Sequence, residues 1–180
     1  MTTPSGEEAI AATKRWLERA VIGLNLCPFA KAPYVKGRVR IRLSHAQDEE
    51  TLLLDLCEEL QRLAASDENE VETTLLVHPQ VLNDFLDFND FLDVADNALE
   101  QMNLAGELQV ASFHPDYQFA DTTPDDPANR SNRSPYPTLH LLRESSIERA
   151  VQSGFDTDGI YENNIARLRE LGDAGWRALW

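Results

Sequence analysis

Basic residues are scarce in this chain, which has 16 Lys and Arg against 31 Asp and Glu in 180 residues and a formal net charge of −15. Nucleic-acid binders and polybasic membrane-surface proteins need a positive footprint, so the charge argues against nucleic-acid and membrane partners. No run of residues approaches the roughly 18 apolar residues that span a bilayer, and the first residues, MTTPSGEEAI, lack the features of a secretory signal. We therefore expect a cytoplasmic protein.

Cysteine is scarce as well, with only Cys27 and Cys57 present. Two separated cysteines provide neither a disulfide framework nor a CxxC motif, and in the cytoplasm both are expected to be free thiols. The chain also lacks the Walker loop, GxGxxG, GxSxG, HExxH and kinase signatures. The sequence therefore does not favour the common classes of nucleotide-binding proteins and hydrolases. The sequence motifs therefore identify neither a cofactor nor a metal.

The acidic residues are concentrated in the middle of the chain. Residues 48–126 contain 21 acidic residues and a single basic one, Arg62, whereas the first 47 residues are net basic. Within residues 84–96 an aspartate recurs at every third position, a spacing that drifts around a helix and does not match a calcium loop. We interpret this segment as a solvated acidic surface, and docking of a basic protein partner is the alternative.

The hydrophobic pattern predicts an α/β fold in a single domain over residues 1–180. The alternation in RVRIRL indicates a strand at 38–43 with one basic face, whose arginines are expected to neutralise the acidic middle of the chain. Further strands are expected at 73–77, 108–113 and 138–142, and helices at 7–21, 48–64, 81–102 and 158–171. This order favours a sandwich in which a mixed, mostly parallel sheet of about four strands is flanked by helices. The last two strands have no helix between them and are expected to pair antiparallel.

The segment 114–137 is the first candidate for a functional loop, because compact domains seldom contain more than 20 residues without regular structure. It holds five of the nine prolines and combines histidine, arginine and aromatic residues. If the flanking strands are antiparallel, His114 at the end of one strand lies near His140 at the start of the next. We expect the two imidazoles to approach each other at one sheet edge, where α/β folds commonly bind anions.

These observations give a candidate site for a small-molecule enzyme. Cys27 would act as a nucleophile or ligand, one of His114 and His140 as an acid or base, and Arg133 as the anchor for an anionic group. The candidate substrate-binding residues are Asn25, Asp116, Tyr117, Asn129, Arg130, Arg143 and Glu144. Other interpretations stay open: a buried cysteine with core histidines, arginines acting as internal countercharges, a metal site, or a non-catalytic binding protein.

Three phrases of the sequence, GLNLCPFA (23–30), ASFHPDYQFA (111–120) and NRSPYPTLHLLRE (132–144), resemble those of a bacterial protein family, domain of unknown function 1415. The resemblance extends over essentially the whole chain and includes the closing IARLRELG (165–172). It implies a small, soluble bacterial protein. No reaction, cofactor or catalytic residue is carried over from the family, so the functional hypotheses depend on the residues themselves.

Overall fold

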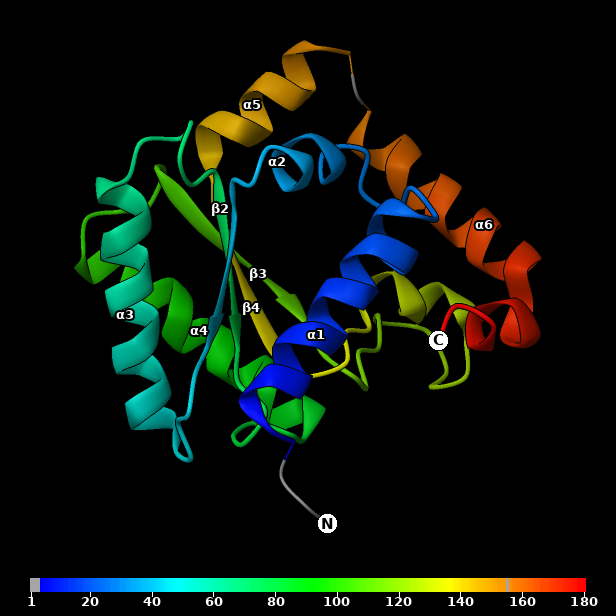
Figure 1. The fold of residues 1–180 in the computed structure, drawn as a ribbon, viewed down its shortest axis with the longest axis horizontal. Coiled ribbons are helices and arrows are strands. Elements are labelled where there is room, and N and C mark those ends of the chain that lie inside the picture. The colour runs from blue at the N-terminus through cyan, green and yellow to red at the C-terminus, as the bar shows by residue number, and fades with distance from the viewer. Residues whose placement is uncertain (1–3, 155) are drawn as a thin grey trace.

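The computed structural model describes residues 4–154 and 156–180 and has one four-stranded sheet flanked by helices (Figure 1). The strands are β1 (Val39–Leu43), β2 (Thr73–Val77), β3 (Leu108–Phe113) and β4 (Thr138–Arg143), in the order β1-β2-β4-β3. The α/β class, the mixed sheet and its four strands are thereby confirmed.

The direction of the strands departs from the expectation. β1 and β2 are parallel and are joined through the helix α3 (Glu49–Ala65), whereas β4 pairs antiparallel with both β2 and β3. The antiparallel pairing of β3 with β4 is confirmed, but a mostly parallel sheet is wrong, since only one of the three pairings is parallel. A loop without a crossover helix returns the chain in the opposite direction, and β4 then enters the sheet antiparallel to both neighbours.

Helices cover both faces of the sheet and create two separate cores. Leucine and phenylalanine side chains of α3 and α4 (Phe85–Gln101) pack on one face, with Leu76, Leu139 and Leu141 of the sheet. On the other face lie α1 (Gly6–Trp16) and its π-helical continuation η1 (Leu17–Ile22), which pack on Leu75. The remaining helices are α2 (Lys31–Val35), η2 (Pro127–Asn132), α5 (Glu144–Gln152) and α6 (Thr157–Arg177). Two of them, α2 and α5, contribute residues to the candidate site on this face.

The basic face of β1 does neutralise the acidic part of the chain. Glu59 on α3 is 1% exposed and accepts two hydrogen bonds from Arg40, at 2.9 and 3.0 Å, with Arg42 at 3.3 Å and Arg62 at 3.7 Å. Burial alone would raise the pKa of Glu59, but the hydrogen bond and the charges of these arginines lower it overall.

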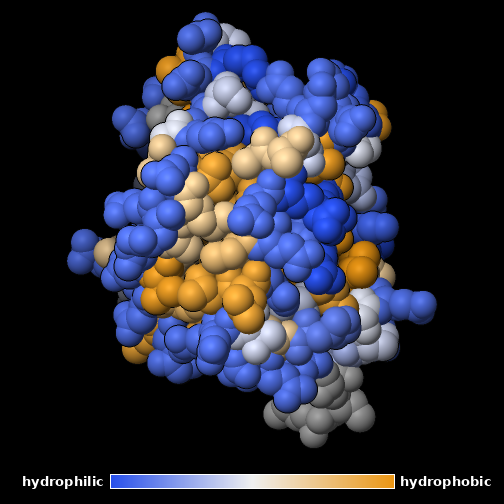
Figure 2. Space-filling model, turned by 90° about the vertical axis from the view of Figure 1, so that its left-hand side faces the viewer, coloured by the Kyte–Doolittle hydropathy of each residue, from blue (hydrophilic) through white to orange (hydrophobic). Residues whose placement is uncertain are grey.

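The surface over α3 is not uniformly hydrophilic. Figure 2 looks onto this side of the molecule and shows hydrophobic side chains gathered among hydrophilic ones. Leu54 of α3 is 66% exposed. Among the helices within the described residues, none is long and apolar enough to cross a membrane.

Candidate functional site

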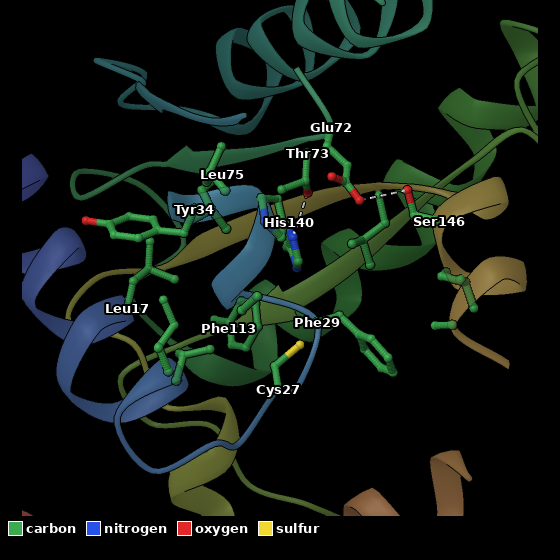
Figure 3. A pocket seen from close by; sticks show the side chains of 18 of the residues that line it. Leu17, Cys27, Phe29, Tyr34, Glu72, Thr73, Leu75, Phe113, His140 and Ser146 are labelled. Atoms are coloured by element: carbon green, nitrogen blue, oxygen red, sulfur yellow. Dashed lines mark hydrogen bonds between the residues drawn. The ribbon is translucent and has the colours of Figure 1, made fainter. Parts of the chain in front are cut away.

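A largely apolar cavity of about 290 Å³ lies on the α1–η1 face of the sheet, bounded by the segment 27–34 and by α5 (Figure 3). Its size and lining are those of a small-molecule site, in which hydrophobic walls enclose a few placed polar groups. The polar side chains that line it are Cys27, Tyr34, Glu72, Thr73, His140 and Ser146. The cavity therefore brings together two of the residues proposed for catalysis, the thiol of Cys27 and the imidazole of His140.

The loop that presents Cys27 is fixed by α6. The amide Nδ2 of Asn164 donates a hydrogen bond of 2.8 Å to the carbonyl of Leu26, and Arg167 donates one of 3.3 Å to the carbonyl of Asn25. Asn25 itself has φ of 52°, a left-handed conformation that asparagine tolerates better than most residues. Asn25 was expected to bind substrate, but it does not line the cavity and lies in the turn that precedes Cys27.

The thiol of Cys27 lies in a weakly polar environment. Burial raises the pKa of Cys27, and hydrogen bonds from the backbone N–H groups of Phe29 and Ala30 oppose this only in part. No cationic side chain contributes to the shift. The group is therefore a protonated thiol at neutral pH, and any nucleophilic role requires a base.

We expect alkylation to report this environment directly. In a C57S chain, Cys27 should react with iodoacetamide more slowly at pH 7 than in the urea-unfolded chain, and its rate should keep rising beyond pH 9.0, its ordinary pKa. Mass spectrometry of a quenched time course measures the rate at each pH, and the C27S chain provides the corresponding profile for Cys57. A plateau below pH 8 would contradict a raised pKa.

His140 is the imidazole that lines the same cavity as this thiol. Its Nε2 lies 2.8 Å from the hydroxyl of Thr73, and that hydroxyl donates its only hydrogen to the carbonyl of Leu141 at 2.6 Å, so Nε2 carries the proton and donates. Within the described part of the chain, Nδ1 makes no hydrogen bond and keeps its lone pair. Burial lowers the pKa of His140 to about 4, which keeps the ring neutral at physiological pH. In Figure 3 the thiol of Cys27 and this ring face the same space.

His114 lies on the opposite face of the sheet. The register of β3 and β4 pairs Ala111 with His140, so these two side chains share a face with Phe113, and the ring of Phe113 lies 5.7 Å from that of His140. Side chains alternate along a strand, so His114 points the other way. The expectation that the two imidazoles approach each other is therefore wrong, because it considered where the strands end and not which face each residue occupies.

The environment of His114 is that of a core histidine. Its ring is fully buried, Nε2 donates to the carbonyl of Leu82 at 3.0 Å, and Nδ1 accepts the backbone N–H of Asp116 at 3.0 Å. Both nitrogens are thus occupied, and burial lowers the pKa of His114. Asp116 contacts it through its backbone, while its side chain is exposed. Neither residue lines the cavity.

Sequence reasoning missed a second buried imidazole, that of His78 at the end of β2. The ring stacks on Phe88 at a centroid distance of 5.7 Å, and Nδ1 donates to the carbonyl of Val81 at 3.0 Å. Its Nε2 is buried without a partner, and burial lowers the pKa of His78 to about 4. The dipeptide His78-Pro79 after an apolar strand was the available signal for a histidine at a strand end.

Arg133 stabilises the long loop and does not anchor a ligand beside Cys27. Its Nε donates to the carbonyl of Tyr117 at 3.0 Å, and its Nη2 donates to that of Pro124 at 2.6 Å. Asn129 acts in the same loop, where its buried amide accepts the N–H of Phe119 at 2.8 Å. The segment 114–137 is thus ordered by its own hydrogen bonds, which explains its mixture of polar residues.

Arg143 and Glu144 join β4 to α5. The Nη2 of Arg143 donates to three backbone carbonyls, those of Leu63 and Ser66 at 3.0 Å and of Val71 at 2.7 Å. Glu144 begins α5, and its backbone N–H bonds to Glu107 in the loop before β3. Both were expected to bind substrate, and neither lines the cavity.

The residues proposed as metal ligands are not gathered at one point. Across residues 4–154 and 156–180, no group of three or more His, Cys, Asp and Glu side chains is arranged to hold a metal ion. Cys27 and His140 share the cavity, whereas His114 and Asp116 lie beyond the sheet.

The family that the sequence phrases suggested also matches the chain as a whole. The model of the family described as Protein of unknown function (DUF1415) matches residues 8–178. The chain belongs to this family. No curated protein and no solved structure matches it. The site described above therefore has to be interpreted from its own geometry.

Proposed function

We propose that this member of the family is an enzyme that acts on a small, largely apolar molecule, with Cys27 as nucleophile and His140 as base. The observation that supports this most is the shared position of the two groups in the wall of one hydrophobic cavity. Arginine has no part in this site, so the substrate is held by apolar contact and not by an anionic group.

The protonation states of the two groups suit a proton transfer during attack. The proton of the Cys27 Sγ–H moves to the free Nδ1 of His140 while Sγ bonds to an electrophilic carbon of the substrate. The cavity is largely apolar, so the imidazolium and the negatively charged substrate oxygen form only together with the new S–C bond. The hydrogen bond from Nε2 to Thr73 keeps the ring in the tautomer that leaves Nδ1 free to accept.

An apolar ester tests this proposal directly. p-Nitrophenyl butyrate should acylate Cys27 in a C57S chain: Sγ bonds to the carbonyl carbon, the C–O bond breaks, and p-nitrophenolate leaves with the electron pair. We expect one burst equivalent of p-nitrophenolate per chain and a butyryl group on Cys27 by peptide mass spectrometry. Replacing His140 by Gln, which can still donate to Thr73, should slow the burst by about a hundredfold.

Two further variants separate cavity chemistry from surface chemistry. A150F places a ring inside the cavity and should abolish the burst, whereas A65F adds the same ring at an exposed position of α3 and should leave it unchanged. A burst that survives A150F, or one that is lost equally in A65F, would reject the proposal. Acylation that is as fast in H140Q as in the C57S chain would remove His140 from it.

A further inference from the structure

A second hollow, of about 810 Å³, opens between α1, the long loop and the C-terminal turn, and it is rich in arginine. Four guanidinium groups line it, those of Arg15, Arg19, Arg130 and Arg133. It lies apart from Cys27 and His140, neither of which contributes to it. In a chain of net charge −15, four cations around one hollow mark it as electrostatically distinct from the rest of the surface.

The arginines of this groove are incompletely neutralised. Arg130 is 13% exposed and makes an ion pair through Nη2 with Asp173, but its buried Nη1 has no hydrogen-bond partner among the described residues. Arg15 and Arg19 are exposed on α1 and η1, and Arg19 donates to the carbonyl of Leu179 at 2.7 Å. In the described part of the chain, the side chain of Arg15 makes no ion pair or hydrogen bond. The exposed guanidinium of Arg15 therefore keeps its donors for an incoming anion.

Aromatic side chains provide the other part of the groove. Trp176 and Trp180 line it and pack edge to face at 5.6 Å, and the guanidinium of Arg130 lies 5.7 Å from the ring centroid of Trp176. Trp16 also lines it and is 1% exposed, and its buried indole Nε1 has no hydrogen-bond partner within residues 4–154 and 156–180. Such rings offer flat apolar contact beside the positive charges.

We propose that this groove binds a small organic anion, a carboxylate or a phosphate ester carried on a flat apolar body. Guanidinium groups match the geometry of both oxyanions and bind them with paired hydrogen bonds. The tryptophan rings then cover the attached body. This site does not depend on the chemistry proposed for Cys27, and each can fail without the other.

Titration calorimetry with 1-naphthyl phosphate and with 1-naphthoate, at low ionic strength, tests the groove and distinguishes the two oxyanions. We expect at least one of them to bind with a single site per chain. R15Q/R19Q should weaken binding about tenfold or more, because two charged donors to the anion are lost. These two arginines are exposed, so the double variant should retain the fold.

The matched control is R62Q/R149Q, which removes the same charge from side chains that are 51% and 52% exposed elsewhere on the molecule. This control should change affinity by less than about twofold, since neither side chain lines the groove. Equal losses in the two double variants would overturn the proposal. Failure of both anions to bind at millimolar concentration would overturn it as well.

Discussion

Lowering the pH from 7 to 4.5 should reduce the free energy of unfolding by about 5 kcal/mol, chiefly through His78 and His140. Burial lowers the pKa of each to about 4, below the ordinary value of 6.5. Above pH 6.5 neither the folded nor the unfolded chain protonates these rings. Below pH 6.5 the unfolded chain binds protons at these rings that the folded chain does not bind, so the free energy of unfolding falls progressively down to about pH 4. Two shifts of this size amount to about 3 kcal/mol each at the acid end.

Urea denaturation at half-unit pH steps between 7.5 and 4.5 measures this loss as the slope of unfolding free energy against pH. H78F keeps an aromatic ring against Phe88 but removes the ionisable group, so it should reduce the slope clearly without abolishing it, whatever its effect at pH 7, because His140 and His114 still contribute. H45F makes the same replacement at an exposed position and should leave the slope unchanged. If H78F has the same slope as the unsubstituted chain, the imidazole of His78 takes up a proton in the folded state as easily as in the unfolded state.

Replacing Arg143 by Ala should destabilise the fold by about 3 kcal/mol. Its guanidinium donates to three carbonyls that end α3 and form the loop before β2, and these acceptors would be left without the charged donor. The loop leads into Glu72 and Thr73, which line the cavity. We therefore also expect R143A to lower the rate of Cys27 acylation.

The appropriate comparison for R143A is R149A, on the helix that follows. Arg149 is 52% exposed and makes an ion pair with Glu68 at 3.0 Å, so its loss should cost less than about 1 kcal/mol. Thermal or urea unfolding of both variants at pH 7 gives the difference. A cost for R143A as small as that for R149A would mean that water replaces the guanidinium at all three carbonyls.

Local patterns in the sequence predicted most of the fold. The alternation of RVRIRL and the leucine spacing of 48–64 fix β1 and α3 to within a residue, because each pattern reflects a single buried face. Strand direction could not be obtained in this way. It depends on where a strand that follows a long loop enters the sheet, and no residue of 114–137 encodes that position locally.

The site was only half predictable for a similar reason. Cys27 and His140 lie 113 positions apart in the sequence, and their shared cavity follows from the packing of η1 and α5 on the sheet. The expectation that His114 lies near His140 was wrong because side chains alternate between the two faces of a strand. The register of β3 with β4 decides which face each residue occupies, and it places the two histidines on opposite faces. The role of Arg143 could not be seen because its partners are backbone carbonyls, which every residue possesses.

The hydrogen bonds from α6 to the turn that precedes Cys27 have a consequence for the order in which the protein matures. Asn164 and Arg167 are synthesised more than 130 residues after the turn that they bind. While a nascent chain still lacks them, that turn has no such restraint, and the side chain of Cys27 has no fixed orientation. A ribosome-bound chain that ends before α6 should therefore expose a mobile thiol. The thiol of Cys27 should take up its fixed position only after α6 has been synthesised.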